Sequence, residues 1–484
     1  MGVSLYTSRV VLDTLGFQDY GVYSVVGGVV GLFSFFHMAM SSATQRFLSF
    51  EIGANNFDQL KKTFNAVVNI HFGIAILVLI LAETVGLWFV MNKLNVPDNR
   101  MDAIHWVYQS SVLSLMLGII QVPYNSLIIA RERMNVYAYI SILEVFFKLL
   151  ILYILVMFDV DKLKLYAVLI FMASLVVRII YQIYCKVQFA ESRYKLYFDK
   201  KLYKELLSFT GWNLFGNVAA IARGQGSNIL LNLFFGAVLN AAYGITLTVS
   251  GAVRTFVGNF QMAMNPQIIK TYAAGDKEQC LKLIFQSSKF SFFLMFLLAS
   301  PIIYNVDFIL KLWLKNPPKY TSLFVVLSLV NVLIDTISGP LIIGAQASGK
   351  IKWYQITIGS LILLCLPISY VFLQFYKLPE IIFIVIIILN VISLFLRIFF
   401  LRKLISLPII PFIKNVLLKI IFTSLTLVFL IYLFNKLFTI QNPIYELVIK
   451  SAYITIINIA TITVIGLNKN ERHFILSFIK KRIN

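Results

Sequence analysis

The sequence has few charged residues and is especially poor in acidic ones. Only 13% of its 484 residues are charged, and Lys plus Arg outnumber Asp plus Glu by 42 to 21. A soluble domain carries about a quarter charged residues, so this composition excludes a soluble globular protein. The apolar residues, 59% of the chain, form continuous runs of about 20 residues, the length that crosses a bilayer as a helix. Because the runs do not alternate every second residue, they predict helices and exclude a membrane β-barrel.

Cysteine and histidine are also scarce. The three cysteines, Cys185, Cys280 and Cys365, and the four histidines show no metal-ligand or redox spacing. We therefore interpret the cysteines as packing residues, and we expect no metal, no cofactor and no catalytic residue.

What the sequence does contain is an all-α, polytopic membrane pattern with about 14 transmembrane helices. Apart from a partial segment at the start, the expected spans lie near residues 20–41, 64–92, 104–130, 136–158, 164–187, 210–236, 237–262, 283–304, 321–346, 353–376, 380–402, 415–436 and 444–466.

Basic residues gather in every second connection between these spans. Arg131, Lys200, Lys201 and the basic residues of the tail 469–482 lie on one side, whereas the other side has far fewer, such as Lys93. The positive-inside rule makes the richer side, and with it the C-terminus, cytoplasmic. The excess charge then serves topology and contact with anionic membrane lipids, so we expect no nucleic-acid partner.

The two halves of the chain repeat one pattern. The stretches "FFHMAMSSATQRFLSF" and "NFQMAMNPQIIKTYAAG" both contain Met-Ala-Met, followed six positions later by Arg46 in the first and Lys270 in the second. Tyr20 aligns with Tyr243 at an offset of 223, and the polar turns "GANNFDQLKK" and "AGDKEQCLKL" follow in the same order. These matches predict two parallel six-helix lobes related by an axis along the membrane normal.

The repeat also sets the expected domain boundaries. We expect an N-terminal six-helix lobe over 1–190, a cytoplasmic linker over 191–209, a C-terminal six-helix lobe over 210–403, and an additional helix pair with a basic cytoplasmic tail over 404–484. The first helix of the N-terminal lobe is too short to cross a bilayer, which predicts a truncated first span. A native short helix in a locally thinned bilayer is the alternative.

The opening of the chain resembles a known family. The stretches "SRVVLDTLGFQDYGVYSVVGGVVGLFSF" and "MSSATQRFLSFEIG" resemble the start of Wzx-type O-antigen or polysaccharide-unit flippases, which belong to the multidrug/oligosaccharidyl-lipid/polysaccharide exporter superfamily. The resemblance extends to the number of spans, the repeat, the extra C-terminal pair and the basic tail.

This resemblance implies a multi-pass transporter of the bacterial inner membrane rather than an enzyme. Such a flippase moves an undecaprenyl-pyrophosphate-linked oligosaccharide, a unit of O-antigen, capsule or exopolysaccharide, from the cytoplasmic to the periplasmic leaflet. It works by alternating access through a cationic central cavity, with polysaccharide polymerase machinery as an expected partner.

Four arginines are our candidates for cations that bind the pyrophosphate. Arg254 and Arg223 lie inside expected spans, where an arginine must face water, protein or an anion. Arg9 lies in the short first span, and Arg46 ends the second one. The structural alternatives are a pairing with backbone carbonyls for Arg254, a helix bend at Gly224 and Gly226 beside Arg223, and membrane-surface anchors for Arg9 and Arg46.

Intramembrane acids are the candidates for ion coupling. Asp335 is a possible proton or sodium site, with an interhelical hydrogen bond as the alternative. Glu144 and Lys148 are four residues apart and are expected to neutralise each other on one helix face. Lys289 is expected to extend to a membrane surface.

Two other functions remain open at the sequence level. A multidrug or cation antiporter of the same superfamily would rely on intramembrane acids, in which this chain is poor. A membrane polysaccharide polymerase or glycosyltransferase would carry a large polar outward loop, whereas the loops near 93–103 and 305–320 are short.

Overall fold

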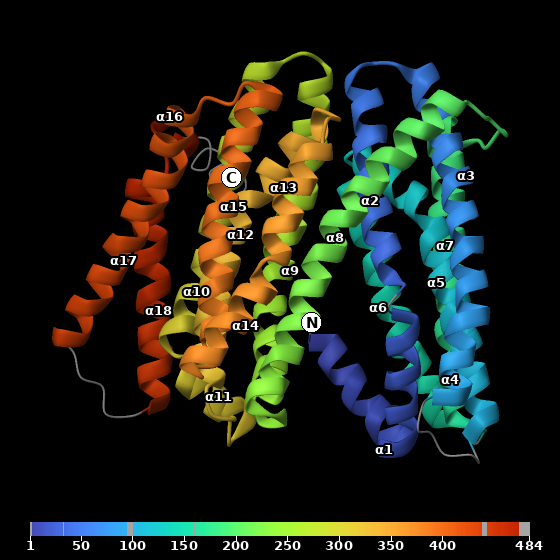
Figure 1. The fold of residues 1–484 in the computed structure, drawn as a ribbon, viewed down its shortest axis with the longest axis horizontal. Helices are drawn as coiled ribbons and strands as arrows, with labels where there is room; N and C mark the ends of the chain where they lie inside the picture. The colour runs from blue at the N-terminus through green and yellow to red at the C-terminus, as the bar shows by residue number, and fades with distance from the viewer. Residues whose placement is uncertain (1, 32, 94–99, 159, 438–442, 474–484) are drawn as a thin grey trace, which may run out of the picture. The chain divides into compact units, whose positions relative to one another are not determined.

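The computed structural model describes residues 2–31, 33–93, 100–158, 160–437 and 443–473 (Figure 1). These residues form helices and no strand, which confirms the predicted all-α class. The main helices are α1 (Gly2–Gly31), α2 (Ser34–Gly53), α3 (Phe57–Leu81), α4 (Leu87–Lys93), α5 (Met101–Ala130), α6 (Met134–Met157), α7 (Lys162–Gln188), α8 (Lys200–Phe235), α9 (Ala237–Ala273), α10 (Lys277–Tyr304), α11 (Val306–Leu314), α12 (Thr321–Ala347), α13 (Lys352–Leu363), α14 (Cys365–Tyr376), α15 (Ile381–Ile405), α16 (Ile409–Phe412), α17 (Leu418–Leu437) and α18 (Pro443–Thr461).

Ten helical segments of the described chain are long and apolar enough to cross a membrane. They include α5, α6, α7, α10, α12 and α15, with hydropathy highest in α15. The ten do not include α8 and α9, the two longest helices of the described residues, which carry more polar side chains. A polytopic helical membrane protein, as predicted from the apolar runs, is therefore confirmed.

The chain divides into two compact units. The N-terminal unit contains residues 1–218 and 272–274, and the C-terminal unit contains 219–271 and 275–484. In the N-terminal unit, α5 packs against α2, α3 and α7 (Figure 1). In the C-terminal unit, α12 packs between α10 and α15. The predicted lobe and linker boundaries at 190, 209 and 403 stay a prediction.

The internal repeat is visible in how two helices begin. The side chain of Asn56 accepts a hydrogen bond from the backbone N–H of Gln59 at the start of α3, and Asp276 accepts one from Gln279 at the start of α10. Each cap follows a residue with positive φ, Asn55 and Gly275, which ends the preceding helix. Short polar side chains at the cap satisfy N–H groups that the helix leaves free, so equal sequence patterns produce equal turns.

The helix pair α17–α18 is fastened to α10 by a buried ion pair. Lys289 lies 2% exposed in α10, and its Nζ lies 2.6 Å from a carboxylate oxygen of Glu471 in the segment after α18. The expectation that Lys289 extends to a membrane surface is wrong, because a carboxylate 182 positions away in the chain provides its partner inside the protein. Gly466 allows this approach, since a Cβ there would lie 2.6 Å from the Phe293 ring.

Candidate functional site

The C-terminal unit contains an ion pair between two predicted site residues. Arg254 of α9 donates from Nη2 to Oδ2 of Asp335 in α12 over 2.5 Å. The Arg254 side chain is 62% exposed, whereas that of Asp335 is 23% exposed. Sequence reasoning placed these two residues in separate roles, as a cation for the cargo and as a coupling-ion site. The structure joins them, so the charge state of one bears directly on the other.

One helical turn before Asp335, an amide contact connects α12 to α15. The Nδ2 of Asn390 donates to the Oδ1 of Asn331 over 2.9 Å, and Asn390 is buried. Polar side chains one turn apart lie on the same face of a helix. Asn331 and Asp335 therefore form one polar stripe on α12, which faces α15 at Asn390 and α9 at Arg254.

Arg223 of α8 reaches the same region. It lines a cavity of about 10 Å³ together with Cys365, Asn390 and Ser393, a space near the size of one water molecule. The neighbouring glycines do not interrupt the helix, because α8 is continuous over Lys200–Phe235. Gly226 instead allows close packing, since a Cβ there would lie 2.5 Å from a methyl group of Leu366.

Arg397 of α15 also belongs to this region. The sequence patterns did not identify it as a candidate site residue. It is 6% exposed, and its Nε donates to the Oγ of Ser393 over 3.2 Å. Its Nη1 donates to the hydroxyl of Tyr354 in α13, whose ring centroid lies 5.6 Å from the guanidinium carbon. A buried arginine thus finds two hydroxyl partners and an aromatic face inside a membrane helix bundle.

A repeat signal was available for Arg397. The stretch "SLVVR" ends at Arg178 in α7, and "SLFLR" ends at Arg397 in α15, with Ser174 and Ser393 at equal places 219 positions apart. This distance is four positions shorter than the repeat offset of 223 seen near Tyr20. Comparison of the last spans of the two lobes would have identified both arginines.

We name these residues the polar cluster of the C-terminal unit. The polar cluster consists of Arg223, Arg254, Asn331, Asp335, Tyr354, Asn390, Ser393 and Arg397. It contains three arginines and one carboxylate, so it carries a surplus of positive charge.

The other two predicted cations differ from those of the cluster. Arg46 lies in α2 of the N-terminal unit and is 5% exposed, with its guanidinium 4.5 Å from the ring centroid of Phe47 and 5.4 Å from that of Phe209. This burial among rings stabilises the end of α2. Arg9 lies in α1, and its side chain is outside the part of the structure that is described.

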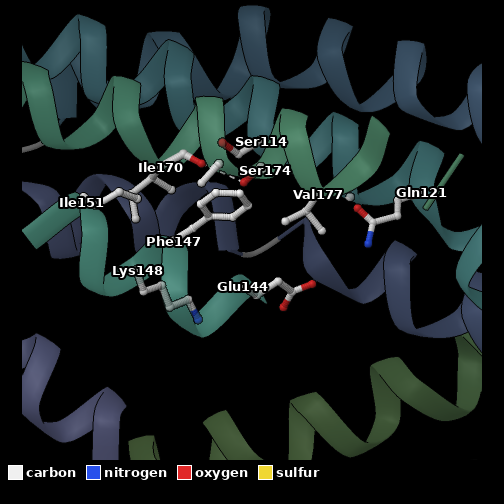
Figure 2. A pocket seen from close by; sticks show the side chains of 11 residues that line it. Ser114, Gln121, Glu144, Phe147, Lys148, Ile151, Ile170, Ser174 and Val177 are labelled. Atoms are coloured by element: carbon white, nitrogen blue, oxygen red, sulfur yellow. Dashed lines mark hydrogen bonds between the residues drawn. The ribbon is translucent and has the colours of Figure 1, made fainter. Parts of the chain in front are cut away.

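The N-terminal unit has its own pocket, of about 220 Å³, lined by apolar and polar side chains (Figure 2). Figure 2 shows Glu144 and Lys148 on the α6 side of this pocket, with Ser114 of α5 and Ser174 of α7 on the opposite side. The two serine hydroxyls donate to backbone carbonyls one turn earlier, over 2.7 and 2.9 Å. Their oxygens therefore remain able to accept hydrogen bonds from a bound group. The predicted charge pair of α6 lines a cavity rather than closed helix packing.

Comparison with solved structures gives a consistent fold. The MATE transporter VcmN of Vibrio cholerae superposes with a TM-score of 0.65 at 16% identity, covering 84% of this chain and 93% of that one. A multidrug resistance MATE family transporter of the MOP superfamily, in an outward-facing conformation, gives 0.67 at 12% identity, with 84% and 91% covered. The MATE transporter ClbM in complex with Rb⁺ gives 0.64 at 16%, with 83% and 94% covered.

These likenesses define the class of fold. The chain has the fold of MATE transporters, members of the superfamily to which the resemblance in the sequence pointed. No protein-family model and no curated protein matches the sequence.

Proposed function

We propose that this protein is a membrane transporter whose cargo is anionic, and that the cargo is a lipid-linked oligosaccharide pyrophosphate. The surplus of arginine over carboxylate in the polar cluster carries this proposal. Charged groups at membrane depth are expensive, so they are kept where they meet a ligand or a partner. Among the described residues, Arg254 is the one cluster arginine that pairs with a carboxylate.

The Arg254–Asp335 pair suits the exchange of one anion for another. A guanidinium has five N–H donors in a planar fork, and the bond to Asp335 uses one of them. A pyrophosphate oxygen that approaches the exposed guanidinium competes with the Asp335 carboxylate for it. Once released, Asp335 gains from taking up a proton or a cation, which would couple cargo binding to ion movement.

The transport test uses purified protein in proteoliposomes and a fluorescent prenyl pyrophosphate that carries a short sugar. Translocation is read as the fraction of probe protected from a reductant added outside. We expect Arg254→Gln to lower the rate about tenfold or more, equal to about 1.4 kcal/mol in the barrier. Arg402→Gln, which removes an exposed arginine near the end of α15, is the matched control and should retain the rate. An unchanged rate in Arg254→Gln would remove the anionic-cargo proposal.

A multidrug or cation antiporter is the second candidate, and the comparisons favour it over the flippase. The similar structures bear the names of MATE transporters, one of them described as a multidrug resistance protein. The pocket that contains Glu144 in the N-terminal unit supports this candidate, because it combines a carboxylate, hydroxyl acceptors and the Phe147 ring, although Lys148 lines it too.

Efflux of a fluorescent organic cation from the same proteoliposomes distinguishes the two candidates. An antiporter predicts cation efflux that depends on Glu144 and is lost in Glu144→Gln, with no translocation of the prenyl pyrophosphate. The flippase proposal predicts translocation of the prenyl pyrophosphate and no efflux of the organic cation.

A further inference from the structure

The segment that connects α7 to α8 is held against the N-terminal unit by hydrogen bonds. The backbone N–H of Lys195 donates to Oδ1 of Asn65 in α3 over 2.9 Å. The amide of Asn69, one turn later in α3, donates to the backbone oxygen of Tyr197 over 3.1 Å and to the hydroxyl of Tyr203 over 2.8 Å. Two asparagines of α3 therefore fix the conformation of residues 194–199.

This fixed conformation turns two large apolar side chains away from the protein. Residues 194–199 are not helical. Tyr197 is half-buried, with its ring centroid 6.0 Å from Nζ of Lys62, whereas Leu196 is 83% exposed and Phe198 is 78% exposed. Phe198 contacts Tyr203 with ring centroids 4.9 Å apart, so its orientation is also held. Ordering residues 194–199 costs conformational entropy, and yet the ordered segment leaves the side chains of Leu196 and Phe198 exposed between α7 and α8.

Positive charge surrounds these two side chains. Lys195, Lys200 and Lys201 are exposed next to them in the chain. The nearby acid, Asp199, is occupied as the cap of α8, because its Oδ1 accepts from the backbone N–H groups of Lys201 and Leu202 over 2.8 and 3.1 Å. Burial is slight there, and these backbone hydrogen bonds hold the pKa of Asp199 below its usual value, so its charge remains on the helix end.

We propose that Lys195, Leu196, Phe198, Lys200 and Lys201 form a binding site for anionic phospholipids of the adjoining leaflet. We call these five residues the linker patch. Leu196 and Phe198 enter the layer below the headgroups, and the lysines contact the phosphates. Apolar side chains flanked by lysines are the composition that binds the interface of an anionic membrane. The location fits, because α7 is long and apolar enough to cross a membrane and ends at Gln188, shortly before the patch.

Charge favours a lipid surface over a protein partner as the occupant. A protein interface depletes lysine at its core, whereas here lysines adjoin both apolar side chains. The proposal is independent of the cargo, since it concerns the surface of the N-terminal unit and leaves the polar cluster unused.

The experiment labels single cysteines with an environment-sensitive fluorophore in the full-length protein, reconstituted in nanodiscs. The three native thiols are buried, so a new surface thiol is labelled selectively. Leu196→Cys reports the patch, and Asp58→Cys, exposed in the first turn of α3, is the matched control. Discs contain phosphatidylcholine alone or with about 30% phosphatidylglycerol, and a spin-labelled lipid serves as quencher.

We expect quenching at position 196 to exceed that at position 58 about twofold or more, and to rise further in the anionic discs. Lys200→Glu combined with Lys201→Glu should remove the rise, while the start of α8 tolerates both acids at a helix N-terminus. Equal quenching at both positions would overturn the proposal. A blue-shifted emission at 196 without quenching by lipid would also overturn it, because protein would then cover the patch.

Discussion

At the scale of single residues, the polar cluster shows how arginines in a bundle of membrane helices find partners. Arg254 has Asp335, and Arg397 has Ser393 and Tyr354. An arginine at that depth without partners is costly, so each partner stabilises the folded state. The two arginines differ in access: Arg397 is buried, and Arg254 is exposed to whatever enters beside α9. We therefore propose that Arg397 contributes to stability and that Arg254 binds the cargo.

Removal of the Tyr354 hydroxyl should destabilise the protein and leave cargo binding intact. Tyr354→Phe deprives the buried Arg397 of one hydrogen bond, at a cost of about 1–3 kcal/mol. Thermal unfolding in detergent should show a lower midpoint for this variant. Tyr370→Phe is a suitable control, since Tyr370 of α14 is 43% exposed. A midpoint equal to that of the wild type would show that the Arg397–Tyr354 contact contributes nothing.

Variants at positions 254 and 335 should show whether transport depends on the ion pair itself or on the position of the cation that binds the cargo. Asp335→Asn alone leaves Arg254 without its carboxylate and should strengthen binding of an anionic prenyl pyrophosphate, because the internal competitor is removed. The double variant Arg254→Asp with Asp335→Arg keeps an ion pair but moves the cation to α12. It should fold and yet transport poorly. Full transport by the double variant would mean that the position of the cation is unimportant.

At the scale of elements, the C-terminal helix pair depends on the Lys289–Glu471 ion pair. Breaking a buried pair by removing one partner leaves an uncompensated charge and costs about 3–5 kcal/mol. Lys289→Met or Glu471→Gln should therefore expose the segment after α18 to limited proteolysis. Lys289→Met with Glu471→Met should be less sensitive than either single change. Protease resistance in both single variants would contradict this role.

A second ion-pair group joins the ends of three helices in the N-terminal unit. Arg100, which precedes α5, donates to Asp19 of α1 and, over 2.9 Å, to Asp161 at the start of α7. Burial raises the pKa of the Asp161 carboxyl, but hydrogen bonds from Arg100 and from the backbone of Lys164 outweigh it and hold the pKa below its ordinary value.

This lowered pKa predicts how stability depends on pH. The Asp161 contribution is complete above the unfolded pKa of about 3.9 and is lost as pH falls through the lower, folded value. The difference in thermal midpoint between wild type and Asp161→Asn should thus be constant from about pH 7 to about pH 5 and shrink toward pH 3. A difference that grows on acidification would contradict the assigned direction.

The element scale also shows how far sequence reasoning reaches. The apolar runs predicted the helices, and the two polar turns predicted the matching starts of α3 and α10, because caps are local. Lys289 was misjudged because its partner lies 182 positions away in the chain. The Arg254–Asp335 contact was missed for the same reason, since residues 81 positions apart meet only through the packing of α9 against α12. Local sequence patterns therefore predict where helices begin and end, whereas ion pairs between helices can be identified only once the fold is known.

At the scale of the whole molecule, the fold and the cargo are separate questions. The fold of MATE transporters is shown by structures that share only 10–16% of their residues with this chain. Fold likeness at this distance leaves the cargo to the chemistry of the site. In this chain that chemistry is cationic in the C-terminal unit, at Arg223, Arg254 and Arg397, and mixed in the N-terminal pocket at Glu144 and Lys148.

The most direct test of an anionic cargo is the equilibrium binding of two probes to the purified, full-length protein. One probe is a soluble prenyl pyrophosphate and the other is a lipophilic organic cation of similar size. We expect tighter binding of the pyrophosphate, weakened about tenfold in Arg254→Gln and unchanged in Arg402→Gln, with cation binding unaffected by either change. Tighter binding of the cation, together with no effect of Arg254→Gln on the pyrophosphate, would contradict the anionic cargo and favour the antiporter.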